Sequence, residues 1–145
     1  MAGKNRALVG LGSYWVNAIA GCNDCHSAGP QTQYAPGGNP YFGQSKVTNA
    51  ATYVGGGRDF GPLTTAPGAL HIVSRNLTPD KTGLPVGGRS FSELREILKT
   101  GTDLDHLHPT GLSSQTTNCL PAPFDGNLLQ IMPWPVYQSM AEQAM

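Results

Sequence analysis

The sequence of 145 residues contains few charges and no long apolar run. Nine Lys and Arg side chains balance nine Asp and Glu, so the formal net charge is zero, and only 12% of residues are charged. A polyanionic nucleic acid is therefore not an expected partner. No apolar run reaches the length of about 18 residues typical of a transmembrane helix, so no membrane span is expected. Residues 1–12 also lack an apolar block long enough for a signal peptide.

Glycine and proline, by contrast, are abundant, with 19 and 12 residues. They show no repeating period of the kind that indicates collagen. This composition predicts a compact, loop-rich chain, and its length suits a single domain over residues 1–145. A small domain with so many loops has a thin hydrophobic core, so a further element is expected to help hold it together.

Cysteine is scarce, and two of the three cysteines stand close together. Three is an odd number and too few for a disulfide framework. Cys22 and Cys25 belong to the segment Cys22-Asn23-Asp24-Cys25-His26, and the C-x-x-C-H arrangement is the attachment sequence of c-type haem. Two thiols at this spacing can reach the two vinyl groups of one porphyrin as thioethers. His26 then lies beneath the iron and can supply the proximal ligand.

Three other interpretations of the motif are open. A thioredoxin-like C-x-x-C needs a preceding strand, whereas residues 7–20 have a helical pattern here. A structural zinc site needs a second ligand pair, for which Cys119, His106 and His108 are the available candidates. The third interpretation is coincidence. We expect one haem c, attached through Cys22 and Cys25.

Local patterns predict two helices separated by a long ordered loop. Apolar residues at helical spacing cover residues 7–20, and Gly21 is suited to end that helix directly before the motif. Residues 29–70 are rich in Gly, Pro and aromatic residues, which predicts an ordered loop lying over one edge of the cofactor. Within it, Gly55-Gly56-Gly57 is interpreted as a turn. Residues 90–101 have a capping box formed by Ser90 and Glu93, an apolar stripe and a terminal Gly101.

The second axial position of the iron also needs a ligand. The candidates are Met132, Met140, an open site, or one of the three remaining histidines, which are His71, His106 and His108. Met132 is favoured because it lies in an apolar segment next to Pro133-Trp134-Pro135, where the prolines predict a stiff, extended backbone. Ligation by His and Met would close both axial positions and raise the reduction potential relative to two histidines.

Taken together, the chain resembles class I cytochromes c of bacterial type, in a subgroup associated with periplasmic dehydrogenases. Four segments carry the resemblance: the helix leading into the Cys22–His26 motif, residues 74–85, the helix ending at residues 99–103, and residues 132–137. The resemblance implies a mainly α, small cytochrome c-like domain whose short helices and long loops surround a covalent haem.

The resemblance also assigns roles to single residues. Cys22 and Cys25 would form the thioethers, His26 would be the proximal ligand and Met132 the distal one. Trp134 and Tyr137 would pack near the haem, and Arg75 or Asn76 would approach a propionate.

One departure concerns the C-terminal helix of the family, for which only residues 139–145 remain. Either the sequence is incomplete or another subunit covers residues 7–20, so a homo- or hetero-oligomer is a possible arrangement. Cys119 would then be a free thiol or pair outside this chain.

The resulting functional expectation is a periplasmic electron carrier rather than an enzyme. It would pass single electrons from a donor, such as a dehydrogenase, to an acceptor, such as an oxidase or another cytochrome. The alternatives are a haem subunit of a larger or polymeric cytochrome assembly and an open-site haem enzyme or sensor.

Overall fold

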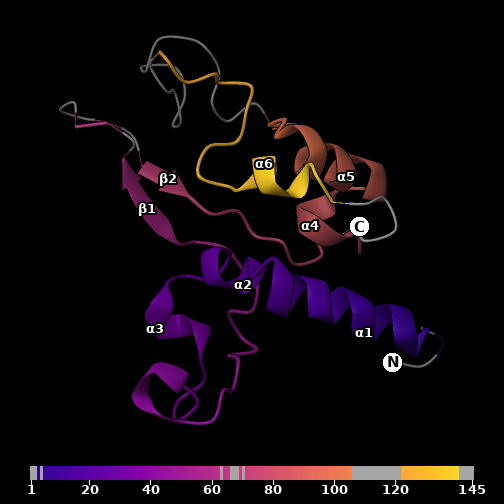
Figure 1. The fold of residues 1–145 in the computed structure, drawn as a ribbon, viewed down its shortest axis with the longest axis vertical. Coiled ribbons are helices and arrows are strands. Elements are labelled where there is room, and N and C mark those ends of the chain that lie inside the picture. The colour runs from indigo at the N-terminus through magenta and orange to yellow at the C-terminus, as the bar shows by residue number, and fades with distance from the viewer. Residues whose placement is uncertain are drawn as a thin grey trace. The chain divides into compact units, whose positions relative to one another are not determined.

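A computed structural model describes residues 3, 5–62, 64–65, 69, 71–105 and 122–140 (Figure 1). The chain forms two compact units. The first comprises Met1–Arg58 and Ser74–Thr78, and the second comprises Asp59–Val73 and Pro79–Met145. Of the described residues, 37% are helical and 9% lie in strands or bridges, so helix predominates over strand.

The first unit begins with the helix predicted over residues 7–20, and the predicted end of that helix at Gly21 is confirmed. Helix α1 (Arg6–Tyr14) starts at Asn5, whose side chain accepts hydrogen bonds from the amides of Ala7 and Leu8 at 3.0 and 3.3 Å. It continues as a π-helix (Trp15–Ile19), in which the amide of Ala20 donates to the Trp15 carbonyl at 2.8 Å. Gly21 then adopts φ 57, a left-handed conformation that suits glycine, and ends the helix directly before the cysteine motif.

Residues 29–58, part of the predicted loop, contain two short helical turns. These are α3 (Pro30–Gln33) and a 3-10 helix (Pro40–Phe42). Hydrogen bonds from Ala35 to Val47 and from Val47 to Gly38, at 2.9 and 3.0 Å, close the loop at its base. Its tip leaves Tyr41 84% exposed although the Tyr41 ring contacts Tyr34 edge to face at 6.3 Å.

The second unit contains a β-hairpin that the sequence patterns did not predict. Strands β1 (Asp59–Pro62) and β2 (His71–Val73) pair antiparallel, with Asp59 opposite Val73 and Pro62 opposite His71. His71 Nδ1 donates to Asp59 Oδ2 at 2.6 Å across the pair. The side chain of Ile72 is buried on the other face of its strand.

Helix α5 (Phe91–Thr100) follows its predicted signals at both ends. The Ser90 hydroxyl accepts from the Glu93 amide at 3.3 Å, and the Glu93 carboxylate accepts from the Ser90 amide at 2.8 Å, which completes the capping box. Gly101 ends the helix with φ 73. A shorter turn, α4 (Pro85–Gly88), precedes α5.

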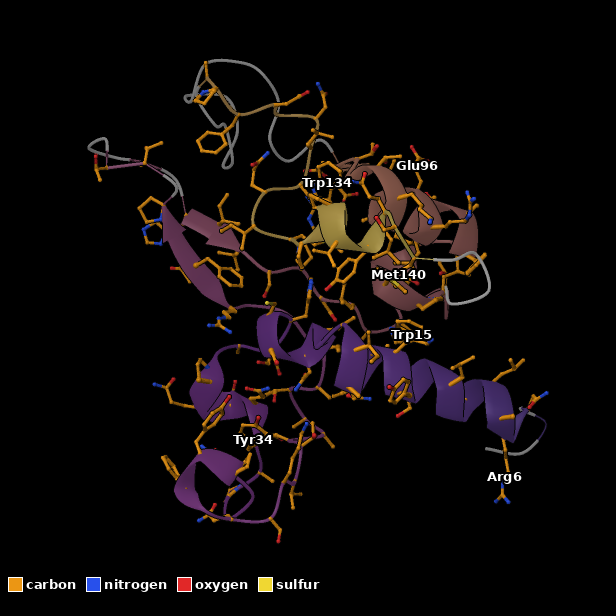
Figure 2. All side chains as sticks on the ribbon, in the orientation of Figure 1. Arg6, Trp15, Tyr34, Glu96, Trp134 and Met140 are labelled. Carbon is orange, nitrogen blue, oxygen red and sulfur yellow. The ribbon has the colours of Figure 1, made fainter. Side chains whose placement is uncertain are left out.

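The prediction of an extended backbone around Trp134 was wrong. Residues Trp134–Tyr137 form a short helix, α6. Pro135 is compatible with this helix because it lies in the first turn, where backbone amides have no acceptor within the helix. Figure 2 shows Trp134 projecting from α6, which packs against α5. The indole lies where a Cβ at position 101 would be, and its Nε1 donates to the Leu129 carbonyl at 3.1 Å.

Candidate functional site

The cysteine motif lies on a single helical turn in the first unit, α2 (Cys22–Cys25). The amide of Asp24 donates to the Gly21 carbonyl at 2.9 Å, and that of His26 donates to the Cys22 carbonyl at 2.8 Å. Residues three apart on a helix share one face, so the turn holds both cysteines on the same side. Both are free thiols and are partly buried. This arrangement suits a ligand attached at two neighbouring points.

His26 is oriented by a backbone carbonyl from a distant part of the chain. Its Nδ1 lies 2.7 Å from the carbonyl oxygen of Arg75. A carbonyl only accepts hydrogen bonds, so Nδ1 carries the proton and Nε2 keeps its lone pair for a metal. Burial lowers the pKa of His26, against the opposing effect of this hydrogen bond. The imidazole is therefore kept neutral, which is the state that binds a metal ion.

The segment carrying this carbonyl is attached to the motif through residues 54–58. Gly56 donates to the His26 carbonyl and Gly57 to the Ser74 carbonyl, both at 2.8 Å. The amide of Leu77 donates to the Val54 carbonyl at 2.8 Å. Three segments far apart in the sequence are thus joined by backbone bonds around the imidazole. We call residues 54–58 and 74–77 the histidine clamp.

A buried side chain joins the clamp to α2. Asn23, which is buried, accepts a hydrogen bond on Oδ1 from the Val54 amide at 2.8 Å. Val54 has φ 47, an unfavourable conformation for a β-branched residue. Such strain persists only where the surrounding contacts hold it, and it is often found at functional sites.

The pKa of Cys22 distinguishes this site from a thiol redox centre. Burial raises the pKa of Cys22, with the neighbouring Cys25 and Asp24 acting in the same direction. Thioredoxin-like motifs instead lower the pKa of a cysteine so that it reacts as a thiolate. In addition, a helix precedes the motif where such proteins have a strand. Both observations disfavour the thioredoxin-like interpretation.

These residues fit a covalent haem by the chemistry of their donors. Two thiols on one face of a turn match the two points of thioether attachment, and a neutral imidazole with a free Nε2 matches an axial ligand. Directly after His26, the Ser27 side chain is fully buried and its hydroxyl has no hydrogen-bond partner among the described residues. A buried hydroxyl without a partner is uncommon in proteins and is consistent with a site that receives a further group.

Met132 lies in the second unit, in a tight turn that leads into α6. Its amide donates to the Gln130 carbonyl, and its own carbonyl accepts from the Trp134 amide, both at 2.8 Å. The preceding Ile131 has φ 68, so the turn is strained next to the predicted ligand. His26 belongs to the first unit and Met132 to the second. Ligation of one iron by both residues therefore stays a prediction.

The other predicted candidates have varied positions. His71 is paired with Asp59 on the hairpin, and Arg75 contributes its carbonyl to His26. Met140 accepts a hydrogen bond from Lys99 through its carbonyl. His106, His108 and Cys119 lie outside the described residues. Within the described part of the chain, no group of three or more His, Cys, Asp or Glu side chains is placed to hold a metal ion.

Comparison of the chain with protein-family models, curated proteins and solved structures gives no match. Among the described residues, no helix combines the length and the apolar character that a bilayer crossing requires.

The sequence patterns missed the histidine clamp. Gly55-Gly56-Gly57 predicts a turn, but a run of glycines can also mark a close approach between backbones, as Gly56 makes to Arg75. The sequence gives no sign of the Arg75 carbonyl, because every residue type has the same backbone carbonyl group. The predicted contact of Arg75 or Asn76 with a propionate stays a prediction.

Proposed function

We propose that this chain is a c-type cytochrome that carries one covalently attached haem and transfers single electrons. The proposal is supported above all by the His26–Arg75 hydrogen bond within a C-x-x-C-H motif. This bond selects the tautomer and the orientation that a proximal ligand needs, and such bonds also tune the electron density of the ligand.

In this proposal Cys22 and Cys25 would hold the porphyrin, and His26 would bind the iron. Met132 would be the second iron ligand, which would leave the iron closed to oxygen and peroxide. The haem supplies a reversible one-electron couple when it is bound. The chain keeps His26 neutral and directed by the Arg75 carbonyl, and it holds Met132 in a turn whose backbone is hydrogen-bonded on both sides.

The broader role follows from the same assignment. We propose a mainly α, cytochrome c-like fold around the haem, acting in the periplasm between a dehydrogenase donor and a cytochrome or oxidase acceptor. With a formal net charge of zero, long-range electrostatic attraction would contribute little to association with either partner.

The visible spectrum and carbon monoxide binding test this role. The haem-loaded protein is expected to show the weak far-red sulfur-to-iron band when oxidised and to leave carbon monoxide unbound when reduced. Met132→Ala should abolish the band and open the reduced iron to carbon monoxide. Met140→Ala is the matched control, because it removes a methionine only eight positions further along, and it should change neither property.

A reduced, unaltered protein that binds carbon monoxide tightly would contradict the electron-carrier role and favour an open-site enzyme or sensor. Loss of the far-red band in Met140→Ala but not in Met132→Ala would show that Met140, and not Met132, is the distal ligand.

A further inference from the structure

Gly56 lies where the three segments around His26 meet. Its amide donates to the His26 carbonyl at 2.8 Å, and the opposite side of its backbone faces Arg75. A Cβ at this position would lie 2.5 Å from the Arg75 carbonyl carbon and 2.6 Å from the Arg75 oxygen. Real Cβ atoms do not approach a backbone so closely, so position 56 requires glycine for its space as well as for its φ of 71.

The Arg75 atom that a side chain at position 56 would strike is the acceptor of the His26 hydrogen bond. That bond is 2.7 Å long. On either side, the hydrogen bonds from Gly57 to Ser74 and from Leu77 to Val54 hold the two backbones together. The clamp therefore allows Arg75 little freedom to move sideways, and a Cβ would displace its carbonyl from the position in which it accepts the His26 hydrogen bond.

We propose that Gly56 is a positioning residue, which sets the strength of the His26–Arg75 hydrogen bond and through it the reduction potential of the haem. This inference rests on the proposed function. A strong bond from Nδ1 makes the imidazole more electron-rich, which stabilises the oxidised iron. Displacing the carbonyl would weaken the bond, favour the reduced iron and raise the potential.

Gly43, which lies outside the histidine clamp, provides a matched control. It also has a positive φ, of 73, so alanine causes backbone strain at either position. At position 43, however, a Cβ would have no atom of another part of the chain within 4 Å. Both variants replace glycine with alanine at a positive φ. Only the variant at position 56 places a Cβ against the Arg75 carbonyl.

The experiment compares the haem-loaded unaltered protein with Gly56→Ala and Gly43→Ala. Redox titration against a mediator of known potential gives the equilibrium constant for reduction, and NMR of ¹⁵N-histidine-labelled protein reports the His26 Nδ1 proton. For Gly56→Ala we expect the constant to rise about tenfold, which is about 59 mV for a one-electron couple. The Nδ1 proton should shift upfield as its bond weakens. Gly43→Ala should leave both values near those of the unaltered protein.

The possible failures are distinguishable. Equal potentials and equal proton shifts in the two variants would overturn the positioning role while leaving the haem assignment intact. An unaltered protein without covalent haem, judged by intact mass, would overturn the proposed function and this inference together.

A measurement on the unaltered protein covers the case in which Gly56→Ala does not fold. If Gly56 and Arg75 hold His26 jointly, a single local opening of the structure exposes both the Gly56 amide proton and the His26 Nδ1 proton to solvent. Their hydrogen-exchange free energies should then agree. The proposal would be overturned if the His26 Nδ1 proton exchanged at least tenfold faster than the opening free energy measured at the Gly56 amide allows.

Discussion

The indole of Trp134 lies directly against the backbone of Gly101, in the space that a Cβ at position 101 would occupy. The same two segments are joined by the Leu129 amide, which donates to the Gly101 carbonyl at 2.7 Å, and by the bond from Trp134 Nε1 to the Leu129 carbonyl. The end of α5 and the start of α6 are therefore packed through a residue that has no side chain. This contact places the segment that follows Met132.

Substituting Gly101 should destabilise the second unit through two effects. Alanine at φ 73 costs about 1–2 kcal/mol of backbone strain. Displacing the indole adds the cost of overpacking, about 1–3 kcal/mol. Urea unfolding followed by circular dichroism measures the sum. Gly83→Ala is the control, since Gly83 has φ 79 with open space around its Cα, and it should show the strain alone. Equal losses in both variants would disprove the packing role of Gly101.

Removing the side chain of Asn23 should weaken the histidine clamp. Asn23→Ala leaves the partly buried Val54 amide without its acceptor, which costs about 1–3 kcal/mol of unfolding free energy. Asn17→Ala is the matched control: Asn17 is exposed and accepts a hydrogen bond from the Tyr53 hydroxyl, which water can replace. We expect that loss to stay within about 0.5 kcal/mol. Chemical denaturation of both variants gives the comparison, and a smaller loss for Asn23→Ala than for Asn17→Ala would contradict it.

The hairpin should respond to acid through Asp59. The hydrogen bond from His71 lowers the pKa of Asp59, with the Gly61 amide contributing in the same direction. Because the pKa is depressed in the folded state, the stabilisation is present above the pKa of the unfolded chain. It is lost as the pH falls through the folded value. His71→Ala should therefore raise the Asp59 pKa towards its ordinary value.

Carboxyl ¹³C NMR titration of both proteins measures this change. Glu93 is an internal reference, because its lowered pKa arises from its hydrogen bonds with Ser90 rather than from His71, and it should titrate alike in both. An Asp59 titration unaffected by His71→Ala would show that the ring does not hold the carboxylate in solution.

Local sequence signals were sufficient to predict the structure of segments whose conformation depends only on nearby residues. Gly21 and Gly101 end their helices in left-handed conformations, and Ser90 and Glu93 form the capping box, because each depends on residues within one turn. The prolines beside Trp134 predict an extended backbone, and this prediction is wrong because proline is well tolerated in the first turn of a helix.

Features that depend on distant residues could not be predicted in this way. The pairing of β1 with β2 joins two short strands without a clear alternating pattern. The Arg75 carbonyl reaches His26 across 49 positions of sequence, and a backbone acceptor has no residue type to reveal it. The motif therefore predicts which side chains would hold a haem, and the structure shows which backbone acceptor lies against His26.

The intact mass of the matured protein tests the central claim most directly. Expressed in a host with haem-c attachment machinery, the chain should exceed its amino-acid mass by one haem that persists under denaturing conditions. Cys22→Ala with Cys25→Ala should lose the added mass, whereas Cys119→Ala should retain it. A chain recovered from that host at the mass of its amino acids alone would contradict the account.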